Sequence, residues 1–99
     1  MFLVGDIGGT NARFAIARTA GNKSIVLSDF EKFTASQFDR FDETMNQFVE
    51  KIGHRPSLAV LAVAGPINDG EVKFTNRNWH LRTSEIKEKC RINEVCLMN

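Results

Sequence analysis

The sequence predicts an α/β fold built on a mixed sheet, and three observations lead to that prediction. Short apolar and alternating runs separated by glycine turns predict an antiparallel meander of strands over residues 2–33. Apolar residues at helical spacing then predict a helix over residues 36–52. Two further apolar runs of strand length predict strands near residues 58–64 and 94–98.

Within the meander, strands are predicted at residues 2–6, 12–18 and 25–33. The loop between the first two strands is too short to hold a crossover helix, so these strands should be antiparallel neighbours. A glycine turn over residues 20–22 separates the second strand from the third.

The helix has a start signal and a stop signal. Ser36, with Asp39 three residues later, is a capping pattern. Gly53 is placed to end the helix, and Pro56 prevents it from continuing. The apolar positions recur at helical spacing, which predicts a stripe that faces the core: Phe38, Phe41, Met45, Phe48, Val49 and Ile52.

The second half of the chain begins with a continuous apolar run over residues 58–64, which is typical of a strand buried on both faces. The order strand, helix, strand makes this run a parallel neighbour of the first strand. Residues 68–70, Asn-Asp-Gly, predict a hairpin with residues 72–74 as its second strand. A short helix over residues 84–89 precedes the last strand at residues 94–98.

The turn between the first two strands carries the strongest functional signal. Gly8 and Gly9 lack a Cβ, so backbone N–H groups could approach the phosphate oxygens of a ligand closely. Thr10 and Asn11 add short side chains that can hydrogen-bond to the same oxygens. Asp6, at the end of the strand, could hold a magnesium ion through water. These residues outline a site for the phosphates of a nucleotide.

The same turn has a plain alternative, because Asp, Gly and Asn are common in ordinary hairpin turns. It is not a Walker loop, since no Gly-Lys-Ser/Thr sequence follows. It is not the dinucleotide fingerprint either, because a strand rather than a helix is predicted after Gly9. The loop alone leaves both the phosphate site and the plain turn open.

Composition excludes several classes of partner. The chain has 99 residues, which is enough for one small domain, and a formal net charge of +1, which gives no reason to expect nucleic acid or an acidic membrane as partner. No apolar run approaches the roughly 20 residues that span a bilayer. Cys90 and Cys96 are interpreted as reduced packing residues, with a disulfide as the alternative. A cytoplasmic location is therefore expected.

Four motifs in order give the chain a family resemblance: Val4–Arg13, Ala64–Ile67, Thr75–Trp79 and Cys96–Asn99. With them the chain resembles the amino-terminal lobe of bacterial glucokinases, ATP-dependent sugar kinases of the actin/Hsp70/hexokinase superfamily. The resemblance implies half of a ribonuclease H-like (actin-like ATPase) fold. Residues 1–99 would form a single small lobe, and the large lobe would be absent.

The resemblance also implies roles for individual residues. The first phosphate loop for MgATP would consist of Asp6, Gly8, Gly9, Thr10 and Asn11, with Asp6 holding Mg²⁺ through water. Gly65 and Pro66 would line the cleft near the sugar, and Asn76 would shape its wall together with Trp79. Asn99 would hydrogen-bond to sugar hydroxyls. The aspartate that acts as general base would directly follow Asn99, so the chain itself would contain no catalytic residue.

The implied function is ATP-dependent phosphorylation of glucose by the full-length protein, which would be a dimer. Because the base and one half of the site would be missing, the 99-residue chain alone should have negligible kinase activity. It should also self-associate through the surface that the missing segments would cover.

Two other functions stay open from the sequence. One is a kinase for another hexose or an amino sugar, and the other is a non-catalytic sugar-sensing module of the same fold. The role of Trp79 also stays open between stacking on a sugar ring and anchoring the core. His80 is interpreted as structural, because no carboxylate or cysteine lies at metal-ligand spacing from it.

Overall fold

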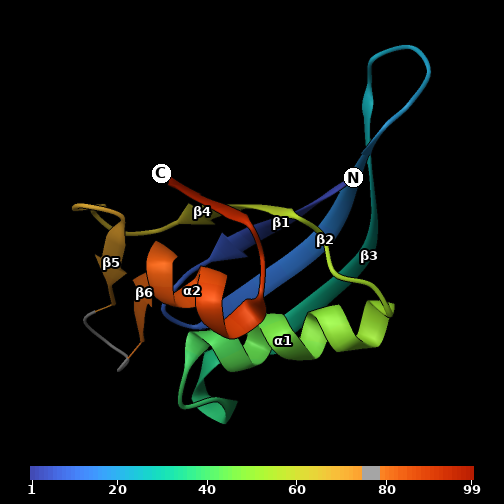
Figure 1. Cartoon of the computed structure of the whole chain (residues 1–99). Helices are drawn as coiled ribbons and strands as arrows, with labels where there is room; N and C mark the ends of the chain where they lie inside the picture. The colour runs from blue at the N-terminus through green and yellow to red at the C-terminus, as the bar shows by residue number, and fades with distance from the viewer. Residues whose placement is uncertain (75–78) are drawn as a thin grey trace.

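The computed structural model describes residues 1–74 and 79–99, which fold into a five-stranded mixed sheet with α-helices on one face (Figure 1). The strands of this sheet are β1 (Phe2–Ile7), β2 (Asn11–Thr19), β3 (Ile25–Thr34), β4 (Leu58–Val63) and β7 (Glu94–Met98). The helices are α1 (Phe41–Ile52) and α2 (Thr83–Cys90), with a 3-10 turn, η1 (Ala35–Gln37), after β3. A small second sheet pairs β5 (Glu71–Lys73) with β6 (His80–Arg82). The predicted α/β fold is confirmed.

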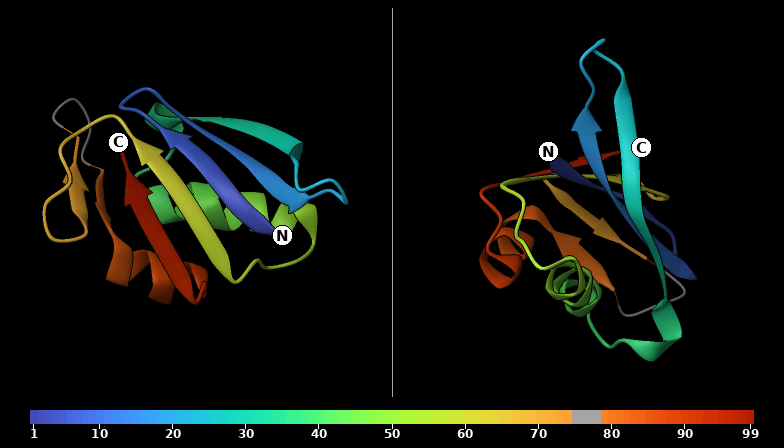
Figure 2. Two further views of the ribbon diagram at one scale, coloured as in Figure 1. Left: turned by 90° about the horizontal axis from the view of Figure 1, so that it is seen from above. Right: turned by 90° about the vertical axis from the view of Figure 1, so that its right-hand side faces the viewer.

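The strand order β3-β2-β1-β4-β7 gives the sheet an antiparallel half and a parallel half. The meander pairs β1 with β2 and β2 with β3 antiparallel, whereas β1 with β4 and β4 with β7 are parallel. The crossovers through α1 and α2 step in the same direction across the sheet. Crossovers of the usual right hand that step in one direction place their helices on one face. Figure 2 shows both helices on that face.

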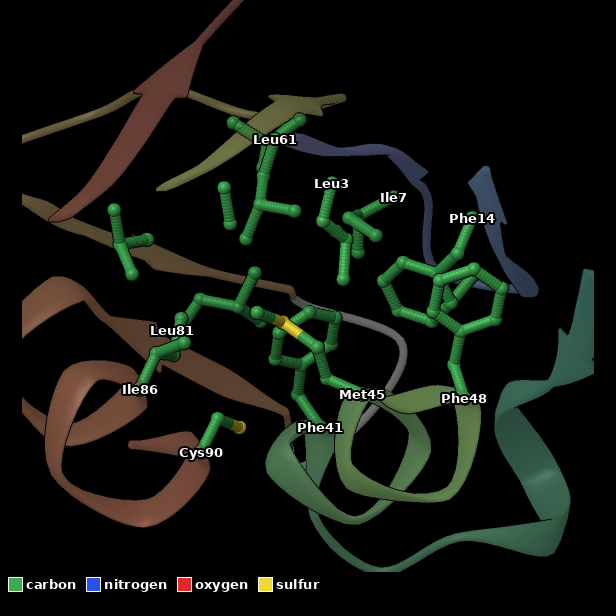
Figure 3. Close-up of a cluster of buried hydrophobic side chains, with 14 of the residues drawn as sticks. Leu3, Ile7, Phe14, Phe41, Met45, Phe48, Leu61, Leu81, Ile86 and Cys90 are labelled. Carbon is green, nitrogen blue, oxygen red and sulfur yellow. The ribbon is translucent and has the colours of Figure 1, made fainter. Parts of the chain in front are cut away.

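The core lies between the sheet and the helices, as Figure 3 shows. Phe14 of β2 is at its centre, with ring centroids 5.4 Å from Phe48, 5.8 Å from Phe33 and 6.0 Å from Phe41. The predicted apolar stripe faces this core. Four of its members lie in α1 and are buried: Phe41, Met45, Phe48 and Val49. The other two pack against the cluster, Ile52 at the end of α1 and Phe38 before its start.

The helix predicted over residues 36–52 begins later than expected, at Phe41. Its first turn is closed by Glu43, whose Oε1 accepts the Arg40 N–H at 2.9 Å. The predicted capping pattern at Ser36 does not start the helix, because that residue lies in η1. The predicted end is confirmed: Gly53 has a left-handed φ of 81° and donates its N–H to the carbonyl of Val49.

Trp79 explains why the helix does not begin earlier. Its indole is 2% exposed, packs edge-on against Phe41 and donates Nε1–H to the Phe38 carbonyl at 3.1 Å. In a helix starting at residue 36, that carbonyl would accept the N–H of Asp42 instead. Trp79 is therefore a core anchor, and the alternative of stacking on a sugar ring is wrong for this structure.

One face of the sheet has no helix over it. The buried residues of β4 are Ala59, Leu61 and Val63, whereas the alternate positions, on the other face, are half-buried. The prediction that this strand is buried on both faces is wrong, because both helices pack on the same side. The uncovered side, called here the open face, is largely apolar: Val4, Ala15, Leu27, Phe30, Val60, Ala62, Cys96 and Met98.

The hairpin of β2 and β3 extends beyond the rest of the sheet (Figure 1). A register shift between Phe14 and Ile16 marks a bulge, and Asp29 in the opposite strand has a positive φ of 58°. β3 is an edge strand that exposes four large apolar side chains: Ile25, Val26, Leu27 and Phe30.

The predicted Asn-Asp-Gly turn is present, but its second strand has another partner. Asp69 and Gly70 have positive φ values of 50° and 74°, as a two-residue hairpin turn requires. The pairing across the turn is the isolated bridge between Asn68 and Glu71, and β5 pairs with β6. In that pair Val72 faces Leu81, and both side chains are buried.

Candidate functional site

Three of the predicted site segments lie at one edge of the sheet. The parallel strands β1, β4 and β7 are neighbours, and their carboxyl ends point to the same side (Figure 2). Gly8 follows β1, Gly65 lies just after β4, and Asn99 follows β7. The carboxyl edge of parallel strands is where α/β proteins bind ligands.

The turn from β1 to β2 is held in place by backbone hydrogen bonds. The Gly8 N–H donates to the Asn11 carbonyl at 3.0 Å, and the Thr10 carbonyl accepts the Ala35 N–H at 2.8 Å. The segment is thus a well-formed turn, and the Gly8 N–H is used within it. Within this turn the side chain of Thr10 is exposed, whereas Gly9 and Asn11 are half-buried.

The folded chain itself does not require glycine at position 8. A Cβ built there would meet only the Asn11 carbonyl oxygen, at 3.9 Å, which is ordinary van der Waals contact. At Gly5 the same test finds Leu61 Cδ2 at 2.7 Å, so packing alone requires glycine there. The open space at Gly8 is what the close approach of a ligand needs, and it favours the phosphate site over the plain turn.

Asp6 offers an accessible carboxylate beside this turn. Its side chain is 72% exposed, and its Oδ2 lies 3.8 Å from Nη1 of Arg13 on the neighbouring strand. Nowhere in residues 1–74 and 79–99 do three His, Cys, Asp or Glu side chains form a metal-binding group. Mg²⁺ is commonly bound by one or two carboxylates together with waters and substrate phosphates, so Asp6 fits that role when phosphates are present.

The structure brings two of the predicted sugar-site residues together. Asn99 Nδ2 donates to the Gly65 carbonyl at 2.6 Å and to the Val63 carbonyl at 3.1 Å. Pro66 follows with an exposed ring. Asn76 lies outside the described residues.

A backbone hydrogen bond joins this segment to the phosphate turn. The Ala64 N–H donates to the Ile7 carbonyl at 3.1 Å, and Ile7 directly precedes Gly8. Hydrogen bonds therefore connect the end of β1 to the end of β4, and the end of β4 to Asn99 after β7. This arrangement holds the Gly8 turn and the Asn99 amide in one frame.

One polar cluster near this edge was not predicted. His80 Nε2 lies 2.6 Å from Glu71 Oε1, and Arg82 Nε donates to the same oxygen at 3.4 Å. The hydrogen bond with His80 is the main cause that lowers the pKa of Glu71. A hollow of about 270 Å³ lies beside it, lined by Pro66, Asn68, Glu71, Lys73 and His80. The sequence carried no signal for this cluster, because the pairing of β5 with β6 creates it. His80 is paired here, as the structural interpretation expected.

The two cysteines lie in different environments. Cys90, the last residue of α2, is buried, and burial raises the pKa of its thiol to about 12, so this thiol is unreactive. Cys96 is exposed on the open face, so its interpretation as a packing residue is wrong. Both thiols are free, and the alternative of a disulfide is wrong.

In the part of the chain that the structure describes, neither helix has the length and apolar character needed to cross a membrane.

Comparisons with known proteins agree with this picture. The family model described as "Glucokinase" matches residues 3–99. The glucokinase of Rhizobium leguminosarum bv. trifolii is 40% identical over 98 residues, which is 98% of this chain and 28% of that protein. The glucokinase of Saccharophagus degradans is 33% identical over 87 residues, 87% of this chain and 27% of that protein.

Solved structures show the same relationship. The crystal structure of a glucokinase from an Antarctic psychrotroph superposes with a TM-score of 0.89 at 36% identity, covering 99% of this chain and 31% of that one. The glucokinase of Balamuthia mandrillaris, solved in complex with glucose, gives a TM-score of 0.64 at 27% identity, covering 99% and 29%. The chain spans less than a third of the length of these relatives.

Proposed function

Because the chain belongs to the glucokinase family, we propose that it supplies the phosphate loop and part of the sugar cleft for ATP-dependent phosphorylation of glucose. The observation that carries the proposal is the placement of Gly8, Gly65 and Asn99 at the ends of three adjacent parallel strands. That placement lets one turn approach the phosphates of ATP while the neighbouring loops approach the sugar. The relative solved with glucose supports glucose as the sugar.

In the proposed reaction the terminal hydroxyl of glucose attacks the γ-phosphorus of ATP, the bond to the β–γ bridging oxygen breaks so that ADP leaves, and the hydroxyl proton goes to a general base outside these residues. Mg²⁺, when bound, supplies positive charge that stabilises the phosphates during transfer. Asp6 would hold that ion through water, and Gly8 and Gly9 would let the backbone approach the phosphate oxygens. Thr10 and Asn11 would hydrogen-bond to the same oxygens. Phosphoryl transfer depends mainly on positioning and charge stabilisation, and this chain would contribute to both.

Residues 1–99 act, in this proposal, as the single small lobe of a two-lobe kinase. In this proposal the general base comes from outside residues 1–99, because the chain spans less than a third of the length of its relatives. The 99-residue chain alone is therefore expected to form no ADP above background when given glucose and MgATP. The protein translated from the complete reading frame is expected to form ADP in a glucose-dependent way.

A pair of glycine variants tests the phosphate loop directly. Gly8→Ala adds a methyl group where the chain leaves room, so its free energy of unfolding should change by no more than about 0.5 kcal/mol. Its kcat/KM for MgATP should fall at least about tenfold, because the methyl group occupies the space for the phosphates. The measurement is glucose-dependent ADP formation by the complete-frame protein, alongside urea unfolding of the same variant.

Gly5→Ala is the matched control, because its Cβ would lie 2.7 Å from Leu61 Cδ2. This overpacking should lower the free energy of unfolding by about 1–3 kcal/mol. Full activity of Gly8→Ala would contradict the phosphate-loop assignment. Absence of glucose-dependent ADP formation by the unmodified complete-frame protein would contradict the proposed function itself.

We further propose that the isolated 99-residue chain self-associates through the open face and that the complete protein is a dimer. Parallel strands such as β1, β4 and β7 are usually covered on both faces, and here one face is bare. At high concentration, a second copy of the isolated chain can pack on this bare face and cover it.

Sedimentation velocity tests this self-association. The isolated chain should sediment as oligomers whose proportion rises with concentration, and Leu27→Lys on the open face should shift it toward monomer. Val26→Lys is the control, because Val26 is also exposed but points to the opposite side of β3. A monodisperse monomer at high concentration would count against the proposal.

We also place the protein in the cytoplasm. That compartment supplies ATP and keeps thiols reduced, and the free state of Cys90 and Cys96 is consistent with it.

A further inference from the structure

His80 lies in a cluster of polar side chains where β5 pairs with β6. Its Nε2 is 2.6 Å from Oε1 of Glu71, and its Nδ1 is 3.3 Å from Nη2 of Arg82. A guanidinium group only donates hydrogen bonds, so Nδ1 must be the acceptor and carries no proton. The single ring proton is therefore on Nε2, which donates it to Glu71. In this arrangement His80 is neutral.

Glu71 connects this cluster to the sugar-side loop, the name used here for residues 65–68 after β4. Its backbone exchanges two hydrogen bonds with Asn68, of 2.9 and 3.0 Å. The next residue of β5, Val72, packs against the start of the loop, since a Cβ on Gly65 would lie 3.1 Å from Val72 Cγ2. The position of the loop therefore depends on the position of Glu71.

Arg82 has a second carboxylate within reach, on the helix side of the cluster. Its Nε is 3.4 Å from Glu71 Oε1, and its Nη1 is 3.7 Å from Glu85 Oε2 in α2. The other carboxylate oxygen of Glu85 accepts a hydrogen bond from Arg40, at the start of α1. Because the Arg82 side chain is 46% exposed, it has room to move between the two carboxylates.

Protonation of His80 would disturb this arrangement. Histidine is the side chain that gains a proton between about pH 5 and 8. A second ring proton, on Nδ1, would face the Arg82 guanidinium, so two donors would oppose each other and two positive charges would repel.

The charged groups around His80 decide where a displaced Arg82 goes. Among the described residues, the other charged side chains that line the two hollows beside His80 are Glu71, Lys73, Asp39, Arg40, Asp42 and Glu85. Lys73, directly opposite His80 in the β5–β6 pair, adds a further positive charge on the β5 side. The carboxylates at the start of the two helices attract Arg82 to the other side, toward Glu85.

We propose that His80 is a positioning residue that makes the sugar-side loop respond to pH. Neutral His80 keeps Arg82 on Glu71, and protonation of His80 releases Arg82 toward Glu85. Glu71 then loses one of its two partners, and the sugar-side loop is less firmly placed before the sugar binds. Such a loss of pre-organisation weakens binding. The inference rests on the proposed function, and it means that the affinity for glucose falls as the pH falls through the titration of His80.

The first test concerns the proton and the loop, and it needs no sugar. In the ¹⁵N-labelled 99-residue protein at about pH 8, two-bond ¹H–¹⁵N correlations should show the ring proton of His80 on Nε2. On acidification the backbone amide signals of Gly65 and Asn68 should move with the same midpoint as the ring of His80. In His80→Gln these movements should vanish, because the glutamine amide can donate to Glu71 and accept from Arg82 but does not titrate.

Two NMR results would overturn the proposed coupling. One is a proton on Nδ1 of His80 at about pH 8, because Arg82 would then have no acceptor there. The other is a set of loop amide signals that stay in place while the ring of His80 titrates.

The second test measures glucose binding by calorimetry, without ATP, in the complete-frame protein. From about pH 8 to about pH 5.5 the Kd for glucose should rise at least about threefold. At about pH 8, His80→Gln should bind glucose within about twofold of the unmodified protein, and its Kd should lose the change that follows the titration of His80. A change that alters only stability would not remove a pH dependence of this kind.

His54→Gln is the matched control, because His54 is the other histidine of the 99 residues and is also half-buried. Its Nε2 lies 3.0 Å from Met1 Sδ, away from the sugar-side loop, so His54→Gln should keep the pH dependence of the unmodified protein.

The outcomes separate this inference from the proposed function. A Kd for glucose with the same pH dependence in His80→Gln as in the unmodified protein would overturn the inference, and glucose-dependent ADP formation would still support the proposed function. Glucose binding that follows the titration of His80, without any ADP formation, would contradict the proposed function and leave the inference standing. Absence of glucose binding at every pH would contradict both.

Discussion

Replacing Phe14 with alanine is expected to lower the free energy of unfolding by about 3–5 kcal/mol. The ring is 2% exposed and lies within 6.0 Å, centroid to centroid, of Phe33, Phe41 and Phe48. Its removal leaves a cavity and also breaks contacts between the sheet and α1. Since small domains are stable by only about 5–15 kcal/mol, this single change removes a large part of the total. Urea unfolding followed by the fluorescence of the buried Trp79 measures the effect.

Two controls separate loss of packing from loss of an aromatic ring in general. Phe14→Leu keeps most of the apolar volume and should cost less than Phe14→Ala. Phe30→Ala removes a ring that is 68% exposed, so the free energy of unfolding should change by no more than about 0.5 kcal/mol. A Phe14→Ala variant that unfolds at the same urea concentration as the unmodified chain would show that the core is not organised around this residue.

Asp6→Ala is expected to lower kcat/KM for glucose-dependent ADP formation by at least about 100-fold in the complete-frame protein. In the proposed function this carboxylate would hold Mg²⁺ through water, and the charge of the ion would stabilise the phosphate oxygens during transfer. Stability should hardly change, because the side chain is 72% exposed. The measurement is steady-state ADP formation at several Mg²⁺ concentrations, with urea unfolding of the same preparation.

Arg13→Ala is the matched control for Asp6. It removes the cation 3.8 Å from the Asp6 carboxylate but leaves the carboxylate in place. An exposed ion pair contributes only about 0–1 kcal/mol, so activity should stay within about threefold of the unmodified protein. If both variants lost activity to the same degree, Asp6 would be acting through its ion pair and not through a metal ion.

Local patterns in the sequence were enough to predict the strands of the meander and two of the turns. The apolar alternation of the meander depends only on which side chains face the core, and β1, β2 and β3 lie where it placed them. Gly53 ends α1 because a left-handed φ favours glycine whatever surrounds it. The Asn-Asp-Gly turn is likewise a local property of residues 68–70.

The predictions for the start of α1, the burial of β4 and the partner of β5 were wrong because each depends on contacts between residues far apart in the sequence. Nothing near Ser36 shows that the Phe38 carbonyl is taken by an indole from residue 79, which keeps this stretch out of the helix. The apolar run of β4 indicated a buried strand, but the number of covered faces depends on where the helices pack. The pairing of β5 with β6, which creates the Glu71–His80 contact, is non-local in the same way.

For the candidate site, the sequence placed Asp6, Gly8, Gly65 and Asn99 at strand ends, and the structure brings these strand ends to one edge. Which atoms meet could not be read from the sequence. The direction of the Asn99 hydrogen bonds depends on the register of β4 with β7, which sets the Val63 and Gly65 carbonyls opposite the amide. Their assignment to phosphate, magnesium and sugar stays a prediction.

The bulge in β3 has a consequence for how isolated chains assemble. A flat edge strand can act as a template on which identical strands add indefinitely as a cross-β fibre. Here the irregularity near Asp29, followed by the charges of Glu31 and Lys32, breaks the regular edge. Within β3, the regular stretch before the bulge covers residues 25–28, of which Ile25, Val26 and Leu27 are apolar, and it is shorter than the six or seven residues of a typical steric zipper. The end of the β2–β3 hairpin can therefore associate with other chains through its apolar side chains, whereas β3 as a whole resists growth into amyloid.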